Sequence, residues 1–179
     1  SIMGKVLIIG GTKGIGKAIV SEIIEEHEVV CLSRNISDFT HNNYKHIKFD
    51  VLNDEFPEIE SLDTLIYCPG TINLKPISTL TLDDFRYDFE LNVIGAVKAI
   101  KKYLNLLKKS ENPSILMFST VATKLGMPYH SSVSVSKSGI DGLVKTLGAE
   151  LAPKIRINAI APTITNTDLA SKILRNEKV

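Results

Sequence analysis

Short apolar runs alternate with segments of helical periodicity along the chain, and this alternation constrains the fold more than any other feature. The runs are almost wholly apolar, as expected for strands that are buried on both faces of a sheet. They lie at 5–9, 29–32, 47–49, 64–68, 115–118 and 155–160. Amphipathic helices are predicted at about 15–24, 83–109 and 131–151. Because right-handed βαβ crossovers connect such elements, we predict an α/β fold, a doubly wound parallel sheet with helices on both faces.

Two of the predicted helices are long and have marked ends. The first is predicted to run unbroken from Asp83 to Lys109, before Asn112-Pro113. The second runs from Ser131 to Leu151 and ends before Pro153. Apolar side chains recur along one side of the first helix at Phe85, Phe89, Val93, Val97, Ile100 and Leu104. Such stripes could pack on the sheet or against a second copy of the chain.

The composition excludes several classes of protein. The chain has 21 Lys and Arg residues against 20 Asp and Glu residues, and its net charge of +1 gives no field for nucleic acid or an anionic membrane. The longest early apolar run, 6–9, is too short for a membrane span or a signal peptide. Cys31 and Cys68 lack the spacing of metal ligands, so we expect no metal and two core cysteines. We expect a single domain over residues 1–179, located in the cytoplasm.

A glycine-rich turn joins the first strand to the first helix. Glycine permits a tight turn there and lets a phosphate approach the N–H groups at the helix N-terminus. Three residues separate Gly10 from Gly14 and one separates Gly14 from Gly16, so the spacing differs from G-x-G-x-x-G. Its position at the first strand-to-helix junction predicts a dinucleotide site of the Rossmann type. The predicted contacts are Gly10, Thr12, Lys13, Gly14, Ile15 and Gly16.

This turn resembles the Gly-x-x-x-Gly-x-Gly turn of the short-chain dehydrogenase/reductase family, and the similarity covers nearly the whole chain. Further segments match in the family's order: Asp50-Val51, Cys68-Pro69-Gly70, Asn92, 118–122, 136–139, 156–162 and Thr167-Asp168-Leu169. The resemblance implies a nicotinamide cofactor and hydride transfer between that cofactor and a carbonyl or alcohol carbon. The implied cofactor contacts are Asp50, Val51, Cys68, Pro69, Gly70, Lys137, Pro162, Ile164 and Thr167. Of the family's usual Asn-Asn-Ala-Gly, the chain keeps only the glycine, Gly70.

The end of the second strand indicates which nicotinamide cofactor to expect. An NAD site usually has an Asp or Glu there, whereas this strand ends Ser33-Arg34-Asn35, with no acid before Asp38. A guanidinium can hold a 2′-phosphate in bidentate fashion, and Lys13 adds a second positive charge. This pair resembles the NADP-preferring branch of the family, so we expect NADP(H), contacted by Ser33, Arg34 and Asn35. The alternative is that Arg34 and Lys13 are ordinary surface charges.

The catalytic set implied by the resemblance is incomplete. Lys137 and Asn92 occupy the positions of the family's Lys and Asn, and Thr120 occupies that of its Ser. The family's general acid and base is a Tyr four residues before the Lys, and here that position is Val133. Valine can neither donate nor accept a proton. The predicted catalytic residues are therefore Asn92, Thr120 and Lys137.

Three functions stay open at this point. The chain could bind NADP as a catalytically silent subunit or regulatory module. Another group or water could replace the tyrosine, since losing a positioned acid commonly costs about 10²–10⁴-fold and leaves measurable activity. The substrate could also be an activated C=C bond, as in enoyl reductases of the wider family, whose Tyr stands seven residues before the Lys. His130 stands there beside Tyr129 and could supply a proton, although both could be solvated residues near a helix start.

The resemblance also bears on size, substrate and assembly. Family members commonly continue past the sixth strand with a substrate-covering loop, a further helix and a last strand. The sequence ends at Val179, so the expected fold lacks that C-terminal helix and last strand, and the small-molecule substrate stays unidentified. The helices at 83–109 and 131–151 resemble the pair that packs across a two-fold axis in the family, so we expect a homodimer or homotetramer.

Overall fold

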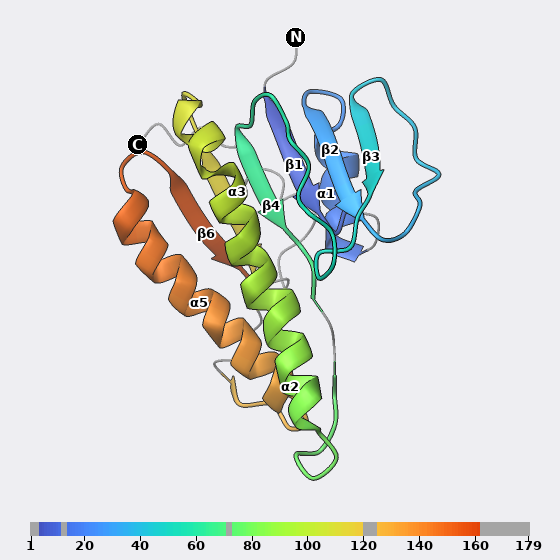
Figure 1. Cartoon of the computed structure of the whole chain (residues 1–179), viewed down its shortest axis with the longest axis vertical. Coiled ribbons are helices and arrows are strands. Elements are labelled where there is room, and N and C mark those ends of the chain that lie inside the picture. Colours follow the sequence, from blue (N-terminus) through green and yellow to red (C-terminus); the bar gives the residue numbers. More distant parts are fainter. Residues whose placement is uncertain (1–3, 12–13, 71–72, 120–124, 162–179) are drawn as a thin grey trace.

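The computed structural model describes residues 4–11, 14–70, 73–119 and 125–161, and within them one six-stranded parallel sheet. Its strands are β1 (Lys5–Ile9), β2 (Glu28–Ser33), β3 (Tyr44–Lys48), β4 (Thr64–Tyr67), β5 (Ser114–Phe118) and β6 (Arg156–Ile160). Their order across the sheet is β3-β2-β1-β4-β5-β6, so the chain moves outward in one direction after β1 and in the other after β4. This arrangement confirms the predicted doubly wound fold (Figure 1).

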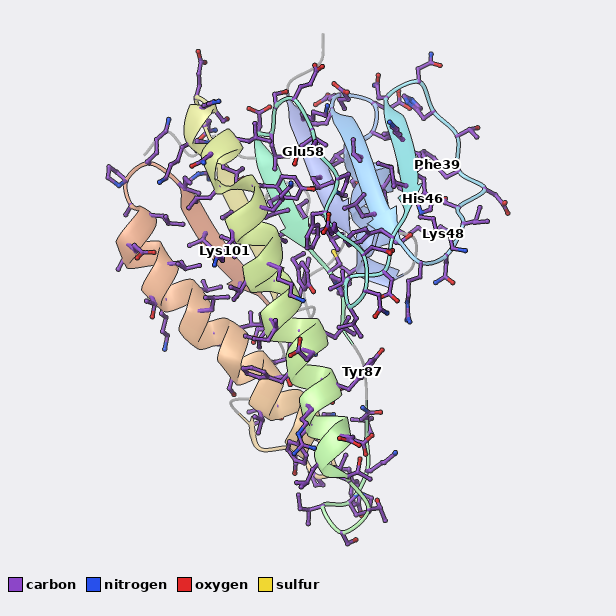
Figure 2. All side chains as sticks on the ribbon, viewed as in Figure 1. Phe39, His46, Lys48, Glu58, Tyr87 and Lys101 are labelled. Atoms are coloured by element: carbon purple, nitrogen blue, oxygen red, sulfur yellow. The ribbon has the colours of Figure 1, made fainter. Side chains whose placement is uncertain are left out.

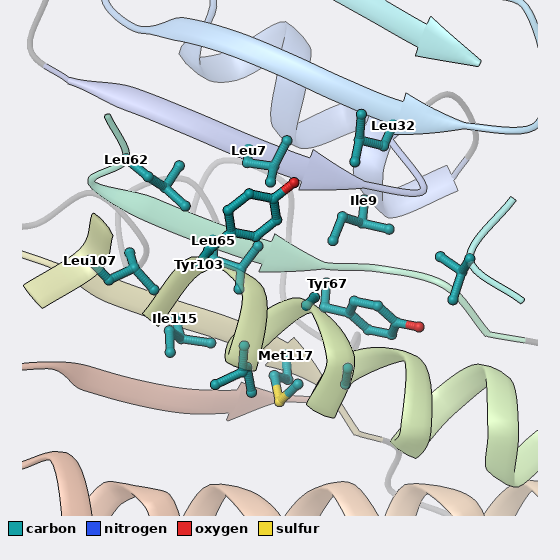
Figure 3. Close-up of a cluster of buried hydrophobic side chains, with 14 of the residues drawn as sticks. Leu7, Ile9, Leu32, Leu62, Leu65, Tyr67, Tyr103, Leu107, Ile115 and Met117 are labelled. Atoms are coloured by element: carbon teal, nitrogen blue, oxygen red, sulfur yellow. The ribbon is translucent and has the colours of Figure 1, made fainter. Parts of the chain in front are cut away.

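Helices cover both faces of the sheet, as expected for right-handed crossovers. They are α1 (Gly14–Ile23), α2 (Leu82–Phe89), a π-helical turn η1 (Glu90–Ile94), α3 (Gly95–Lys109) and α5 (Ser131–Leu151). Helix α1 lies on one face, and α3 and α5 lie on the other (Figure 1). A hydrophobic core lies on each face of the sheet, and successive residues of β1 point into different cores. Ile8 packs in the cluster with α1, whereas Leu7 packs with Tyr103 and Leu107 of α3 (Figure 3).

The predicted long helix over 83–109 is present, but it contains a π turn in its middle that was not predicted. The helix begins at Leu82 after a capping box, in which Thr81 and Asp84 exchange hydrogen bonds of 3.0 and 2.9 Å. The turn η1 then widens it before α3. A π turn holds more residues than an α turn, so it rotates the faces of the helix that follow relative to those that precede it. Of the predicted apolar stripe, Val93 and Ile100 are buried, whereas Phe89 is 41% exposed.

The third strand also differs from its predicted position at 47–49. Strand β3 runs from Tyr44 to Lys48 at the edge of the sheet and pairs only with β2. Its side chains are half-buried or exposed because one edge has no neighbouring strand, so the strand is not a continuous apolar run. A search for apolar runs therefore missed Tyr44, Lys45 and His46 as strand residues.

Candidate functional site

A cleft opens at the carboxyl ends of β1 and β4, where the strand order reverses. It has a volume of about 460 Å³. The structure brings together there the predicted residues Gly10, Gly14, Ser33, Arg34, Asn35, Asp50, Val51, Cys68, Pro69 and Gly70. Leu52, Tyr87 and Leu91 also line the cleft, although the sequence analysis did not select them. The predicted residues Thr12, Lys13, Thr120, Pro162, Ile164 and Thr167 lie outside the described residues.

The glycine turn folds tightly at one wall of this cleft. Gly10 has a φ of +81°, which favours glycine, and its N–H donates to the Leu32 carbonyl at 2.6 Å. Gly16 is buried against the same turn, because a Cβ added there would lie 2.5 Å from Cα of Gly11 and 2.6 Å from the Gly10 oxygen. Any side chain at Gly16 would push the turn away from α1. The described residues of the turn therefore pack directly against the N-terminus of α1, where helix N–H groups can accept an anion.

Asp50 stands at the opposite side of the cleft, after β3. Its carboxylate accepts hydrogen bonds from the Asn53 side chain at 2.8 Å and from the Leu52 backbone N–H at 3.0 Å. These bonds lower the pKa of Asp50, and the positive charge of Arg34 adds to the effect. Asp50 is therefore an ionised acceptor in the wall of the cleft, near the positive charge of Arg34.

Lys137 and Asn92 converge on Gly70, just beyond β4. A Cβ added at Gly70 would lie 3.2 Å from Oδ1 of Asn92 and 3.4 Å from Nζ of Lys137, so the glycine leaves room for both groups. Burial lowers the pKa of Lys137, and the nearby carboxylates of Asp141 and Asp88 act in the opposite direction. Three segments far apart in the sequence thus bring an ammonium and an amide to one point, and the catalytic role of Asn92 and Lys137 stays a prediction.

Asn92 lies in the π turn, and the turn fixes its direction. Its Nδ2 donates to the Asp88 carbonyl one turn earlier at 2.8 Å, whereas its buried Oδ1 has no hydrogen-bond partner among the described residues. The N–H of Gly95 reaches back to Glu90, and the hydroxyl of Tyr67 donates to the Leu91 carbonyl at 2.5 Å. A buried acceptor without a partner is costly, so Oδ1 fits a site that a donor from a ligand or a water completes.

Asp88 is a functional candidate that the sequence analysis missed. It is fully buried at 0% exposure, and its carboxylate accepts hydrogen bonds from Asn73 at 3.0 Å and from Ser132 at 2.5 Å. These bonds connect the segment after β4, helix α2 and the first turn of α5. Because Asn92 bonds to its backbone carbonyl, Asp88 also supports the π turn. An acidic residue on a helix is usually solvated, so the burial of Asp88 was not predicted. The one signal in the sequence was the presence of Phe85 and Phe89 close to Asp88.

Val133 occupies the position one helical turn before Lys137 on α5 and is 6% exposed. His130 lies immediately before α5, and its Nδ1 is 2.7 Å from the Pro128 carbonyl, so the ring donates to the loop that precedes the helix. Tyr129 is exposed and has a φ of 64°. Neither residue is a fixed partner of Lys137 among the described contacts, and the role of His130 as a proton donor stays a prediction.

Both cysteines are free thiols; Cys31 is buried and Cys68 is half-buried. Burial raises the pKa of Cys31, and it raises the pKa of Cys68 to about 12, so both stay protonated at neutral pH. Within the described ranges, no group of three or more His, Cys, Asp or Glu side chains is placed to hold a metal ion. No helix in this part of the chain is long and apolar enough to cross a membrane.

Comparisons with known proteins show which proteins this chain and its fold resemble. A sequence model of the family described as short chain dehydrogenase matches residues 4–178. A tropinone reductase homolog of Arabidopsis thaliana is 29% identical over 96% of this chain and 73% of its own length. The ligand-free aldohexose dehydrogenase of Thermoplasma acidophilum superposes with a TM-score of 0.83 at 27% identity, over 90% of this chain and 66% of that one. ElxO with NADP bound superposes with a TM-score of 0.79 at 26% identity, over 94% of this chain and 77% of that one.

Proposed function

The chain belongs to the short-chain dehydrogenase/reductase family of oxidoreductases, and from this premise we propose that it uses NADP(H) to transfer a hydride to or from a carbonyl or alcohol carbon. One observation carries the proposal: Nζ of Lys137 and Oδ1 of Asn92 converge at Gly70, at the end of the cleft. A positioned ammonium beside an unpaired amide oxygen is suited to hold ribose hydroxyls and an ordered water.

Different residues of the cleft would contact different parts of the cofactor. The glycine turn and the N-terminus of α1 would hold the pyrophosphate, and Asp50 and Val51 would contact the adenine. Ser33 and Arg34 would hold a 2′-phosphate, because Arg34 is exposed and free to form a bidentate pair. The NADP bound to ElxO, a relative at 26% identity, supports this choice of cofactor.

Lys137 and Asn92 would have different tasks in the reaction. Nicotinamide, when bound, supplies or accepts the hydride. The Lys137 ammonium would donate to the ribose, and burial strengthens its hydrogen bonds because water is excluded. Oδ1 of Asn92 would accept a hydrogen bond from a water that carries protons to Lys137. Thr120 would orient the substrate oxygen.

A second candidate function is a catalytically silent NADP-binding subunit or regulatory module. The buried and apolar Val133 favours it, because no proton can be exchanged at the position of the family's tyrosine. A reductase of an activated C=C bond is a variant of the first proposal and would need a proton from His130 or a water.

Turnover and cofactor binding, measured together, test the proposal. We expect NADPH to bind and to be oxidised by at least one compound of a panel of ketones, quinones and enoyl thioesters. Lys137→Met should weaken NADPH binding and abolish turnover, whereas Lys145→Met, an exposed lysine of the same helix, should change neither. NADPH binding without turnover across the panel would favour the silent module. Failure to bind NADPH would refute both the NADP(H)-dependent oxidoreductase and the silent NADP-binding module.

We further propose that the chain forms a homodimer or homotetramer through α2 and α5. Phe89 on α2 and Val135 on α5 are 41% and 55% exposed, so each helix leaves large apolar side chains uncovered. Light scattering on a size-exclusion column measures the assembly. Phe89→Asp together with Val135→Asp should produce monomers, and an unchanged mass would refute this interface.

A further inference from the structure

Ser33 makes two side-chain hydrogen bonds at the rim of the cleft. Its Oγ donates to the backbone carbonyl of Asn35 at 3.1 Å, and the same oxygen lies 2.8 Å from Nε2 of His46. Ser33 ends β2 and lines the cleft. His46 belongs to the neighbouring edge strand β3 (Figure 2) and is not among the residues that line the cleft.

The donors and acceptors in this group can be assigned by counting hydrogens. A carbonyl oxygen can only accept, so the single hydroxyl hydrogen of Ser33 points toward Asn35. The serine oxygen must then accept the bond from His46, and Nε2 of that ring must carry a hydrogen. His46 is therefore a donor to Ser33, and the serine hydrogen is directed away from the imidazole while it bonds to Asn35.

The surroundings of His46 favour a neutral ring in this role. Burial lowers the pKa of His46, and a hydrogen bond to the Ser33 backbone partly offsets this effect. Cys31 lies opposite His46 in the register of β2 and β3, and its pKa is raised by burial, so it is an uncharged thiol. Tyr44 and Lys48 stand two residues away on the same strand face, and Lys48 is exposed.

We propose that His46 is a positioning residue for an adenosine 2′-phosphate, because it keeps the hydrogen of Ser33 available to a ligand in the cleft. The proposal rests on the proposed use of NADP(H). The serine hydrogen has two possible directions, toward the Asn35 carbonyl or toward a phosphate oxygen. Asn35 is exposed, so water can replace the serine as a donor to that carbonyl when the hydrogen turns to the ligand.

The arrangement distinguishes NADPH from NADH. A hydrogen bond from the serine hydroxyl to an ionised phosphate is about twice as strong as a neutral one to a ribose hydroxyl. With leucine at position 46, the serine oxygen would lose the donor that fixes its place at the rim of the cleft, and the hydroxyl would be held less firmly for a ligand. We expect His46→Leu to weaken NADPH binding by about three- to tenfold, the effect of one hydrogen bond, and to leave NADH binding unchanged.

The experiment measures the dissociation constants of NADPH and NADH by calorimetry for the native chain and for His46→Leu and His46→Gln. Gln carries an N–H group near the position of Nε2, so His46→Gln should retain most of the NADPH affinity. The control is His41→Gln, a histidine of the preceding loop that faces Glu25 at 3.5 Å, which should change neither constant. Adenosine 2′,5′-bisphosphate and adenosine 5′-monophosphate, measured in the same way, isolate the contribution of the 2′-phosphate.

A double-mutant cycle separates positioning from a purely structural role. In a Ser33→Ala background, His46→Leu should cause no further loss of NADPH affinity, since the hydroxyl through which it acts is gone. Equal losses for NADPH and NADH, or additive losses in the double variant, would overturn the inference while the proposed cofactor stands. A native chain that binds NADPH and NADH equally would overturn the proposed cofactor, and the role of His46 with it.

Discussion

Replacing Val133 by tyrosine should increase carbonyl reduction. Val133 stands one helical turn before Lys137, and Lys137 converges with Asn92 on Gly70. A phenol at position 133 would place an exchangeable proton beside an ammonium, at the only position of the family's catalytic set where this chain has an apolar residue. The native site would then gain the acid and base that it lacks, without a change in its cofactor contacts.

The size of the effect follows from the helical spacing. Side chains four residues apart on a helix have Cβ atoms about 5–6 Å apart. At about 6 Å and an effective dielectric constant of about 20, an ammonium and a phenolate attract each other by about 3 kcal/mol. This attraction would lower the pKa of the new tyrosine below its ordinary value, toward the range in which a general acid works best. We therefore expect a rate increase of about 10- to 10³-fold.

The substitution should also lower the free energy of unfolding. Val133 is 6% exposed, so a larger side chain would overpack its surroundings and destabilise the fold by about 1–3 kcal/mol. The assay follows NADPH oxidation by the ketone panel for Val133→Tyr and for Val135→Tyr. Val135 is 55% exposed on the same helix, so its substitution should leave the rate unchanged. A folded Val133→Tyr variant that binds NADPH and the ketone normally but reduces it no faster would refute the reasoning. The acid would then come from elsewhere, with His130 the first candidate.

Three further predictions concern the cofactor and the fold. Native NADPH should bind at least about tenfold more tightly than NADH, since a charge-assisted pair contributes about 1.5–3 kcal/mol, and Arg34→Asp should reverse this preference in calorimetry. Burial lowers the pKa of Lys137 from 10.5, and the ammonium exists only below that pKa. NADPH affinity should therefore fall as the pH rises through it. Lys137→Met should remove this pH dependence from a titration of NADPH affinity against pH. Ser132→Ala should lower the free energy of unfolding in urea by about 1.5–3 kcal/mol, because it removes a donor from the buried Asp88 carboxylate, whereas Ser138→Ala, at an exposed position, should have little effect.

The parts of the fold that could be predicted are those with strong local signals. Helix α5 begins at Ser131 and ends at Leu151 as predicted, because its periodicity and the following Pro153 mark it clearly. The central strands could be predicted because a strand that is buried on both faces is a continuous apolar run. Strand β3 was predicted at the wrong position because an edge strand is only half covered, so its sequence mixes apolar and polar residues.

The π turn had no signal in the sequence. Its residues, Glu90 to Ile94, have ordinary helical propensities, and the turn depends on a contact with β4, the hydrogen bond from Tyr67 to the Leu91 carbonyl. Since that bond joins residues far apart in the sequence, local propensity carries no information about it. The same holds for the buried Asp88, whose donors come from the segment after β4 and from α5.

The sequence by itself determined the class of fold, the order of its elements and most of the cleft, because the carboxyl ends of parallel strands meet at one edge of the sheet wherever the strands are placed. It also predicted Val133 at the position of the family's tyrosine, by counting back from Lys137. Only the tertiary structure decided how Lys137 and Asn92 meet at Gly70, and which partners Asp88 and Ser33 have. Hydrogen bonds are directional and short in range, so they depend on the packing of whole elements rather than on the identity of single residues.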